Sequence, residues 1–217
     1  MSKACICKKG LNYILETGEG ESIKIPSQYF PLNGDPQLFT NENTALTDGK
    51  TQAVFNTVHF DLGHCYSNTK SLVEALRAAG IAAESYVGWI TCAGEIPVHH
   101  CWCVIDGNKV LDAGVFLKMK DLEKYAGLSC EEAANLFAAE RIRYEQSMPN
   151  SENFICGVVD PLYAYIGCPC SPEKGREIYR KLIHVFPRHP SYRNLQDPFG
   201  RSAAQETYDK LKRQRGV

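Results

Sequence analysis

The stretch CYSNTKSLVEALRAAGIAAESYVGWIT, residues 65–91, decides the fold of this chain. Its first half carries apolar residues at the spacing of one helical face, namely Leu72, Val73, Leu76 and Ala79. Gly80 stands where such a helix would stop, so the pattern predicts a helix over residues 66–79. The second half is rich in aromatic and β-branched residues, which predicts a strand over residues 81–91.

Two more strands are predicted downstream, at residues 98–105 and 109–115, on either side of Asp106-Gly107-Asn108. A helix followed by three antiparallel strands is an α+β arrangement. We expect an antiparallel sheet of about four to six strands packed against the helix of residues 66–79.

The register of the predicted hairpin decides which side chains meet. With a three-residue loop, Ile105 pairs with Lys109. His100 and Asp112 then project from the same face of the sheet as diagonal neighbours. A two-residue loop would shift the parity and place His99 on the face of the aspartate instead.

The chain offers a complete set of groups for cysteine catalysis, which needs a thiolate, an imidazole that takes and returns its proton, and a group that orients the imidazole. Cys65 lies at or just inside the start of the predicted helix, where the helix dipole favours a thiolate and its own N–H can face an oxyanion. His100 and Asp112 supply the other two groups. A buried structural cysteine would show the same pattern, because Leu72 and Leu76 lie near the same helical face.

Four motifs follow one another between about residues 60 and 115: Cys65 at a helix start, Gly80-Ile81 after the helix, His100-Cys101-Trp102 on the second strand, and Asp112 on the third. This order resembles the transglutaminase-like superfamily of papain-like cysteine enzymes. The resemblance implies a papain-like core and a Cys-His-Asp triad of Cys65, His100 and Asp112. It also implies a thioester formed from an amide, as in proteolysis, deamidation or transamidation, without metal or organic cofactor. His99 would be a bystander.

Two departures from the family pattern concern the proposed triad. The final aspartate of such proteins is often followed by proline, whereas Asp112 is followed by Ala113-Gly114. No glutamine lies upstream of Cys65 at the spacing that papain uses for its oxyanion hole. The second oxyanion donor is therefore open among three candidates: His59, His64 and Tyr66.

Three residues close to the triad in sequence are candidates for contacts with substrate. Asn68, three residues after Cys65, would bond either a substrate carbonyl or the backbone near the helix start. Tyr66 is a candidate oxyanion donor. Trp102 would either shield the imidazole and its carboxylate from water or fill the core.

Ten cysteines in a chain of 217 residues without a secretory signal do not match a small disulfide scaffold, so we expect reduced thiols and a cytoplasmic protein. Three Cys-x-Cys pairs are spaced more closely than most structural zinc ligands: Cys5/Cys7, Cys101/Cys103 and Cys168/Cys170. A zinc-binding interaction protein that uses Cys168, Cys170 and a histidine stays open as an alternative. A non-catalytic binding module on the same fold is the other alternative.

The whole chain of 217 residues is expected to form one domain. Its expected parts are an N-terminal cover at residues 1–49, a core at about residues 50–116 and a helical extension at residues 117–217. Start signals within the extension are a capping box at Ser129 and Glu132 and the pair Ser171-Pro172. A last helix is expected over residues 203–213.

Charge and hydropathy limit the partners that we expect. No stretch approaches the roughly 20 apolar residues of a membrane span, so no membrane contact is expected. From Pro172 onward, 11 Lys/Arg stand against 5 Asp/Glu. Because Arg176 and Arg180 alternate with Glu173 and Glu177 at helical spacing, a solvated helix face is expected rather than a nucleic-acid site. The expected partner is an amide-containing peptide, protein or small molecule.

Overall fold

The computed structural model describes residues 5–16, 22–26, 35–61, 63–92, 98–146 and 151–185. Its helical elements are α1 (Gly49–Phe55), α2 (Cys65–Ala78), the 3-10 helix η2 (Met119–Tyr125), α3 (Cys130–Gln146) and α4 (Pro172–Val185). Its strands are β1 (Cys5–Lys9), β2 (Asn12–Glu16), β3 (Ser22–Pro26), β4 (Gln37–Phe39), β5 (Ala83–Cys92), β6 (Val98–Ile105), β7 (Lys109–Asp112), β8 (Ile155–Gly157) and β9 (Tyr163–Pro169).

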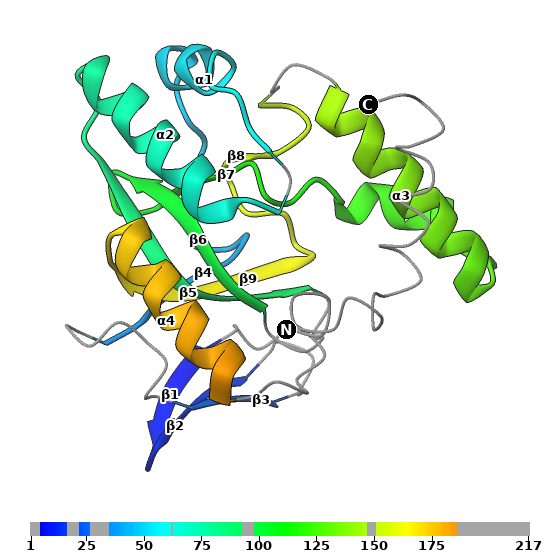
Figure 1. Ribbon diagram of the computed structural model, residues 1–217, viewed down its shortest axis with the longest axis horizontal. Helices are drawn as coiled ribbons and strands as arrows, with labels where there is room; N and C mark the ends of the chain where they lie inside the picture. Colours follow the sequence, from blue (N-terminus) through cyan, green and yellow to red (C-terminus); the bar gives the residue numbers. More distant parts are fainter. Residues whose placement is uncertain are drawn as a thin grey trace.

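Six strands form the main sheet in the order β4-β9-β5-β6-β7-β8, and every neighbouring pair is antiparallel. Figure 1 shows α2 and α4 over this sheet, where both helices contact β5 and β6. A separate three-stranded sheet, β1-β2-β3, packs through Tyr13 and Leu15 on a cluster that includes Trp89 and Leu182. The predicted α+β class, with an antiparallel sheet against the cysteine-bearing helix, is confirmed.

Strand β6 sends alternate side chains into two different cores. On the side of α2, its residues join a cluster that contains Leu72, Val73, Leu76, Cys103 and Ile105. On the other side, they join a cluster that contains Phe39, Tyr86, Trp102, Val104 and Tyr165. Because both faces are buried, a slip of one residue would exchange the two sets of side chains, so packing specifies the register.

Helix α2 begins at Cys65, one residue earlier than the predicted start. It ends at Ala78, and Gly80 just beyond it has a φ of 76°, in the left-handed region that glycine adopts without a Cβ penalty. The N–H of Gly80 donates to the carbonyl of Arg77 and the N–H of Ile81 donates to that of Leu76, both at 2.9 Å. These two bonds satisfy the last turn of the helix, and the predicted stop is confirmed.

Of the two loop lengths considered for the hairpin between β6 and β7, the structure has the three-residue loop, because Ile105 pairs with Lys109. The first two loop residues have φ of 50° and 75°, in the left-handed region that aspartate and glycine tolerate better than most residues. The loop therefore keeps the parity that places His100 and Asp112 on the same face of the sheet.

The helical extension expected over residues 117–217 is only partly observed. Helix α3 follows the predicted capping box, in which the Glu132 carboxylate accepts from the N–H of Ser129 at 2.8 Å, and α4 begins at Pro172. However, β8 and β9 also come from this region, so the expectation of helices alone is wrong. The helix expected over residues 203–213 lies outside the described residues.

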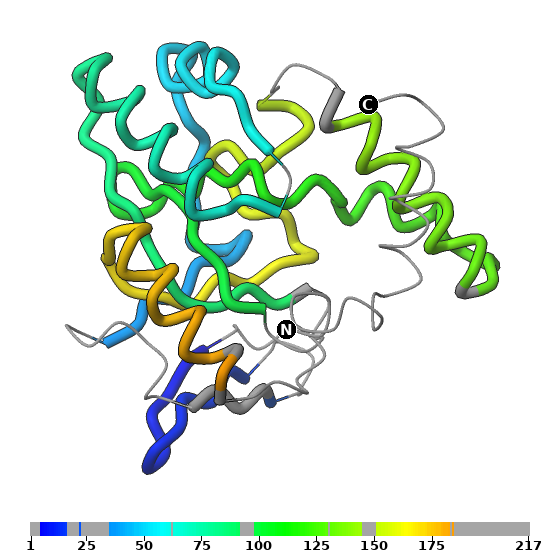
Figure 2. The backbone as a smooth tube through the Cα atoms, viewed as in Figure 1, coloured from blue at the N-terminus to red at the C-terminus, as the bar shows by residue number. Residues whose placement is uncertain are grey.

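Strand β9 lies inside the main sheet, next to β4 from the N-terminal part of the chain (Figure 2). Gly88 of β5 pairs with Gly167 of β9. A Cβ on Gly88 would lie 2.0 Å from the carbonyl oxygen of Ile166, and one on Gly167 would lie 2.5 Å from the Trp102 ring. Glycine at both positions therefore permits the close approach of the two strands beside Trp102.

Candidate active site

His100 and Asp112 form a buried pair on neighbouring strands β6 and β7. The Nε2 atom of His100 lies 2.6 Å from Oδ2 of Asp112, and the two side chains are only 9% and 3% exposed. The register of the hairpin thus brings together the two residues that the sequence paired. A hydrogen bond to Nε2 leaves Nδ1 as the ring nitrogen available to another group.

The Asp112 carboxylate is held by two further donors. Tyr165 of β9 donates its hydroxyl to Oδ2 at 2.8 Å, and the N–H of Gly114 donates to Oδ1 at 2.6 Å. Burial, followed by the charge of Asp112, raises the pKa of Tyr165 well above its usual value, so the phenol stays a donor. With His100, the carboxylate accepts three hydrogen bonds, which stabilise its charged form in a buried place.

Sequence reasoning did not identify Tyr165. The residue lies on β9, which the sequence did not predict, and nothing in the sequence states that this strand runs beside β5. Its alternating tyrosines at 163 and 165 are typical of a strand, but they do not indicate which neighbour the strand has.

Gly114, two residues after the aspartate, lies against both members of the pair. A Cβ at this position would lie 2.7 Å from Cε1 of His100 and 2.9 Å from Oδ1 of Asp112. These distances are shorter than atoms in contact allow, so a larger residue would displace the imidazole or the carboxylate. The Ala113-Gly114 segment thus lets the backbone close over the pair and donate an N–H to it.

Cys65 is the first residue of α2 and is partly exposed. Its side chain lies close enough to His100 to act on that ring electrostatically, because it raises the pKa of His100. The structure therefore brings Cys65, His100 and Asp112 together in the order thiol, imidazole, carboxylate. As residue one of a helix, Cys65 also has an N–H with no acceptor inside the helix.

The charges around His100 favour its protonated form. Burial alone would lower its pKa, but the Asp112 carboxylate and the Cys65 side chain raise it to about 10. The ring is then an imidazolium at neutral pH, between a carboxylate and a sulfur atom. Such a cation stabilises a thiolate and can return a proton to a leaving group.

Asn68 does not turn its amide toward this site. Its Oδ1 accepts from the N–H of Asp61 at 3.1 Å, and its Nδ2 donates to the carbonyl of Asp61 at 2.8 Å. The side chain is buried. Of the two alternatives for Asn68, the structure favours the bond to the backbone, where it fixes the loop that leads into α2.

Tyr66 and His99 lie on the helix side of the sheet. The Tyr66 hydroxyl is 2.7 Å from Nδ1 of His99, so it has a partner other than substrate. His59, another oxyanion candidate, pairs with Asp61 at 3.3 Å on the surface. His64, the third candidate, is exposed and stands at the N-cap position of α2 next to Cys65, where its side chain makes no capping hydrogen bond.

Trp102 is fully buried and stacks with His100 at a ring separation of 6.3 Å and an interplanar angle of 14°. Its ring also packs edge-to-face against Phe39 and Tyr165, at interplanar angles of 81° and 64°. Both alternatives for Trp102 therefore hold: it fills the core and covers one side of the imidazole. It is not placed to touch a substrate from solvent.

The Cys-x-Cys pairs show no metal geometry. Within the described ranges, no group of three or more His, Cys, Asp or Glu residues is arranged to hold a metal ion. Cys101 and Cys103 are buried on the helix side of β6, and Cys103 pairs with Leu111. A pocket of about 530 Å³ lies between α2, β5 and the start of α4, and none of the three site residues lines it.

The comparisons with known proteins assign no family: no family model, no curated protein and no solved structure matches this chain. The resemblance to transglutaminase-like enzymes therefore rests on the sequence motifs alone. Among the helices in the described part of the chain, none combines the length and the apolar composition needed to cross a bilayer.

Proposed function

We propose that this protein is a cysteine hydrolase or acyltransferase that acts on an amide bond. The observation that carries the proposal is the continuous series from Cys65 at the start of α2 through the His100 ring to the buried carboxylate of Asp112. Each group has the partner that covalent cysteine catalysis requires, and the carboxylate is itself held in place.

The reaction follows from these contacts. The Cys65 thiolate attacks the amide carbonyl carbon, and the resulting oxyanion faces the Cys65 N–H. The C–N bond then breaks, the His100 imidazolium gives its proton to the leaving amine, and a thioester on Cys65 remains. Water or an acceptor amine attacks the thioester, His100 takes the proton of that nucleophile, and the thiolate leaves with the acid or the new amide formed.

The proposed fold is a papain-like core of the transglutaminase-like kind. Three features support it: a cysteine at a helix start, a histidine and an aspartate on successive antiparallel strands, and a hydrogen bond between the imidazole and the carboxylate. The eight cysteines described in full are free thiols, which supports a reducing compartment such as the cytoplasm. The proposed substrates are amide-containing peptides, proteins or small molecules.

Selective labelling of thiols tests the nucleophile. Under limiting iodoacetamide at neutral pH, peptide mass spectrometry should find Cys65 alkylated before the other cysteines, because it lies at a helix start beside the His100 imidazolium. His100→Ala should abolish this preference. Earlier labelling of another cysteine in the native protein would remove Cys65 from the proposal.

Acyl transfer tests the chemistry separately. Treatment with p-nitrophenyl acetate, an activated acetyl ester, should place one acetyl group on Cys65 and release the phenol in a burst. Cys65→Ser should lose both signals while it keeps the melting temperature of the natural protein. A binding module without catalysis would label slowly at Cys65 and show no burst.

A further inference from the structure

The neighbours of the two reacting residues are joined to each other. Tyr66 follows Cys65 on α2, and His99 precedes His100 on β6. The Tyr66 hydroxyl and Nδ1 of His99 are 2.7 Å apart and hydrogen-bonded, and both side chains are buried. One polar bond therefore spans the interface between the helix that carries the nucleophile and the strand that carries the base.

The aromatic surroundings of His99 make its hydrogen bond to Tyr66 costly to lose. His99 lies edge-on to Trp89 with ring centroids 5.2 Å apart, and it stacks on Tyr179 of α4 at 5.9 Å. The Nε2 atom of His99 is buried and has no hydrogen-bond partner among the described residues. In such an apolar place, loss of the remaining bond at Nδ1 would leave a second buried nitrogen unpaired, which is costly.

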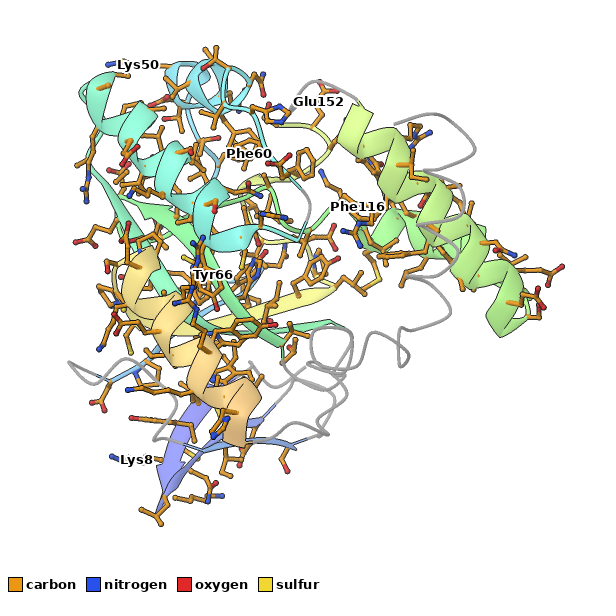
Figure 3. All side chains as sticks on the ribbon, in the orientation of Figure 1. Lys8, Lys50, Phe60, Tyr66, Phe116 and Glu152 are labelled. Carbon is orange, nitrogen blue, oxygen red and sulfur yellow. The ribbon has the colours of Figure 1, made fainter. Side chains whose placement is uncertain are left out.

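Helix α4 holds Tyr66 from its other side. Arg176 donates to the hydroxyl of Ser67 at 2.8 Å, and its guanidinium lies 6.0 Å from the centre of the Tyr66 ring. A Cβ on Gly175 would lie 3.0 Å from Cε1 of Tyr66. Figure 3 shows Tyr66 at the start of α2 beside α4. Because α4 packs on the Tyr66 ring, the Tyr66 hydroxyl has a defined position from which it bonds His99 of β6.

We propose that Tyr66 and His99 are a positioning pair, whose hydrogen bond sets the distance and orientation between the Cys65 sulfur and the His100 ring. This inference rests on the proposed function, because it assigns the pair to the same catalytic site. Neither residue touches the reacting atoms. The sequence assigned no role to His99, whereas the geometry gives it one through its bond to the residue after the nucleophile.

The test is the pH profile of Cys65 alkylation by iodoacetamide in Tyr66→Phe, which removes one oxygen and keeps the ring. We expect the rate near pH 6 to fall roughly tenfold to hundredfold, as displacement of reacting groups by a fraction of an ångström to one ångström does. The acid limb should also move to higher pH. Tyr86→Phe is the matched control, since it removes a hydroxyl bonded to Gln37 at 3.1 Å on the other side of the sheet.

Two variants of His99 keep the test decisive if Tyr66→Phe folds poorly. His99→Asn places an amide where Nδ1 stood and should retain most of the alkylation rate at pH 6, whereas His99→Leu should lose it as Tyr66→Phe does. A purely structural role would lower the melting temperature of both variants without moving the pH profile.

The outcomes separate this inference from the proposed function. If Cys65 of the natural protein reacts no faster than an ordinary thiol and is insensitive to His100→Ala, both proposals are overturned. If Cys65 depends on His100 but Tyr66→Phe and His99→Leu keep the natural pH profile, only the positioning pair is overturned. A shifted profile in these two variants, with Tyr86→Phe and His99→Asn unchanged, supports it.

Discussion

Two consecutive histidines on β6 have opposite chemistry. His99 and His100 are both buried, at 3% and 7% exposure, and they face opposite sides of the same strand. Burial and then the neighbouring His100 charge lower the pKa of His99 to about 3, so its ring is neutral. The carboxylate of Asp112 and the Cys65 side chain overcome burial at His100 and leave that ring charged.

The difference shows that partners rather than depth decide what a buried imidazole does. On the face of His100, the Asp112 carboxylate accepts three hydrogen bonds and stabilises a charged imidazole in a buried place. On the other face, His99 is surrounded by aromatic rings and a tyrosine hydroxyl, and its equally buried imidazole stays neutral. A histidine of the second kind cannot serve as general acid, although it is one residue away from one that can.

The largest expected effect on the difference between the two histidines comes from removing the charge of Asp112. In Asp112→Asn, burial acts on His100 without an opposing carboxylate, so its ring should become neutral, as that of His99 is. Acetylation of Cys65 by p-nitrophenyl acetate should fall by about two to four orders of magnitude, by analogy with serine triads. The burst rate, measured beside the melting temperature, checks this. A lowered melting point with an unaltered burst would remove Asp112 from the site.

Displacement of the His100 ring without a change of charge should have the next largest effect. Gly114→Ala forces a methyl group to within 2.7 Å of Cε1 of His100, so either the ring or the loop must shift. Acetylation of Cys65 should fall roughly tenfold to hundredfold. Gly49→Ala is the control, because a Cβ on Gly49 meets nothing within 4 Å. Equal rates in the two variants would show that the loop yields and the ring stays.

Loss of one donor to the carboxylate should have a smaller effect. Tyr165→Phe removes the bond to Oδ2 of Asp112 but leaves His100 and the N–H of Gly114 in place, so acetylation should fall roughly threefold to tenfold and stability by about 1 kcal/mol. Tyr163→Phe, on the same strand, removes a bond to the carbonyl of Leu117 at 2.8 Å and serves as control. A rate unchanged in Tyr165→Phe would make its hydroxyl purely structural.

The parts of the site that the sequence predicted are those set by local pattern. The helix start at Cys65 and the stop at Gly80 follow from residues within a few positions of each other. The His100 and Asp112 pairing follows from one loop length, because side chains alternate along strands. The helix predicted over residues 66–79 runs from Cys65 to Ala78, whereas the strand predicted over residues 109–115 ends at Asp112.

The parts that the sequence missed depend on contacts between distant segments. Tyr165 reaches Asp112 only because β9 inserts between β4 and β5, and no local signal encodes that order. Asn68, a candidate for substrate contact, has an amide group whose partner is the backbone of Asp61. Tyr66 and His99 are far apart in the sequence, and their hydrogen bond forms only because the helix packs on the strand.

The pH dependence of stability separates the two histidines. Because the pKa of folded His99 is about 3 against its usual 6.5, the unfolded chain binds the extra proton, and stability falls as pH decreases from 6.5 toward 3. His100, whose folded pKa is raised to about 10, contributes stability that is fully present below 6.5 and is lost as pH rises toward 10.

His99→Leu should therefore flatten the acid side of the stability profile. At pH 5.5, His99 should cost the natural protein about 1.4 kcal/mol relative to neutral pH, since one pH unit corresponds to that free energy. Urea unfolding from pH 5 to 9 measures the profile. His184→Gln, at an exposed histidine of α4, is the control and should leave the acid slope unchanged. If His99→Leu kept the full acid slope, the ring would be protonated in the folded protein and the contrast with His100 would fail.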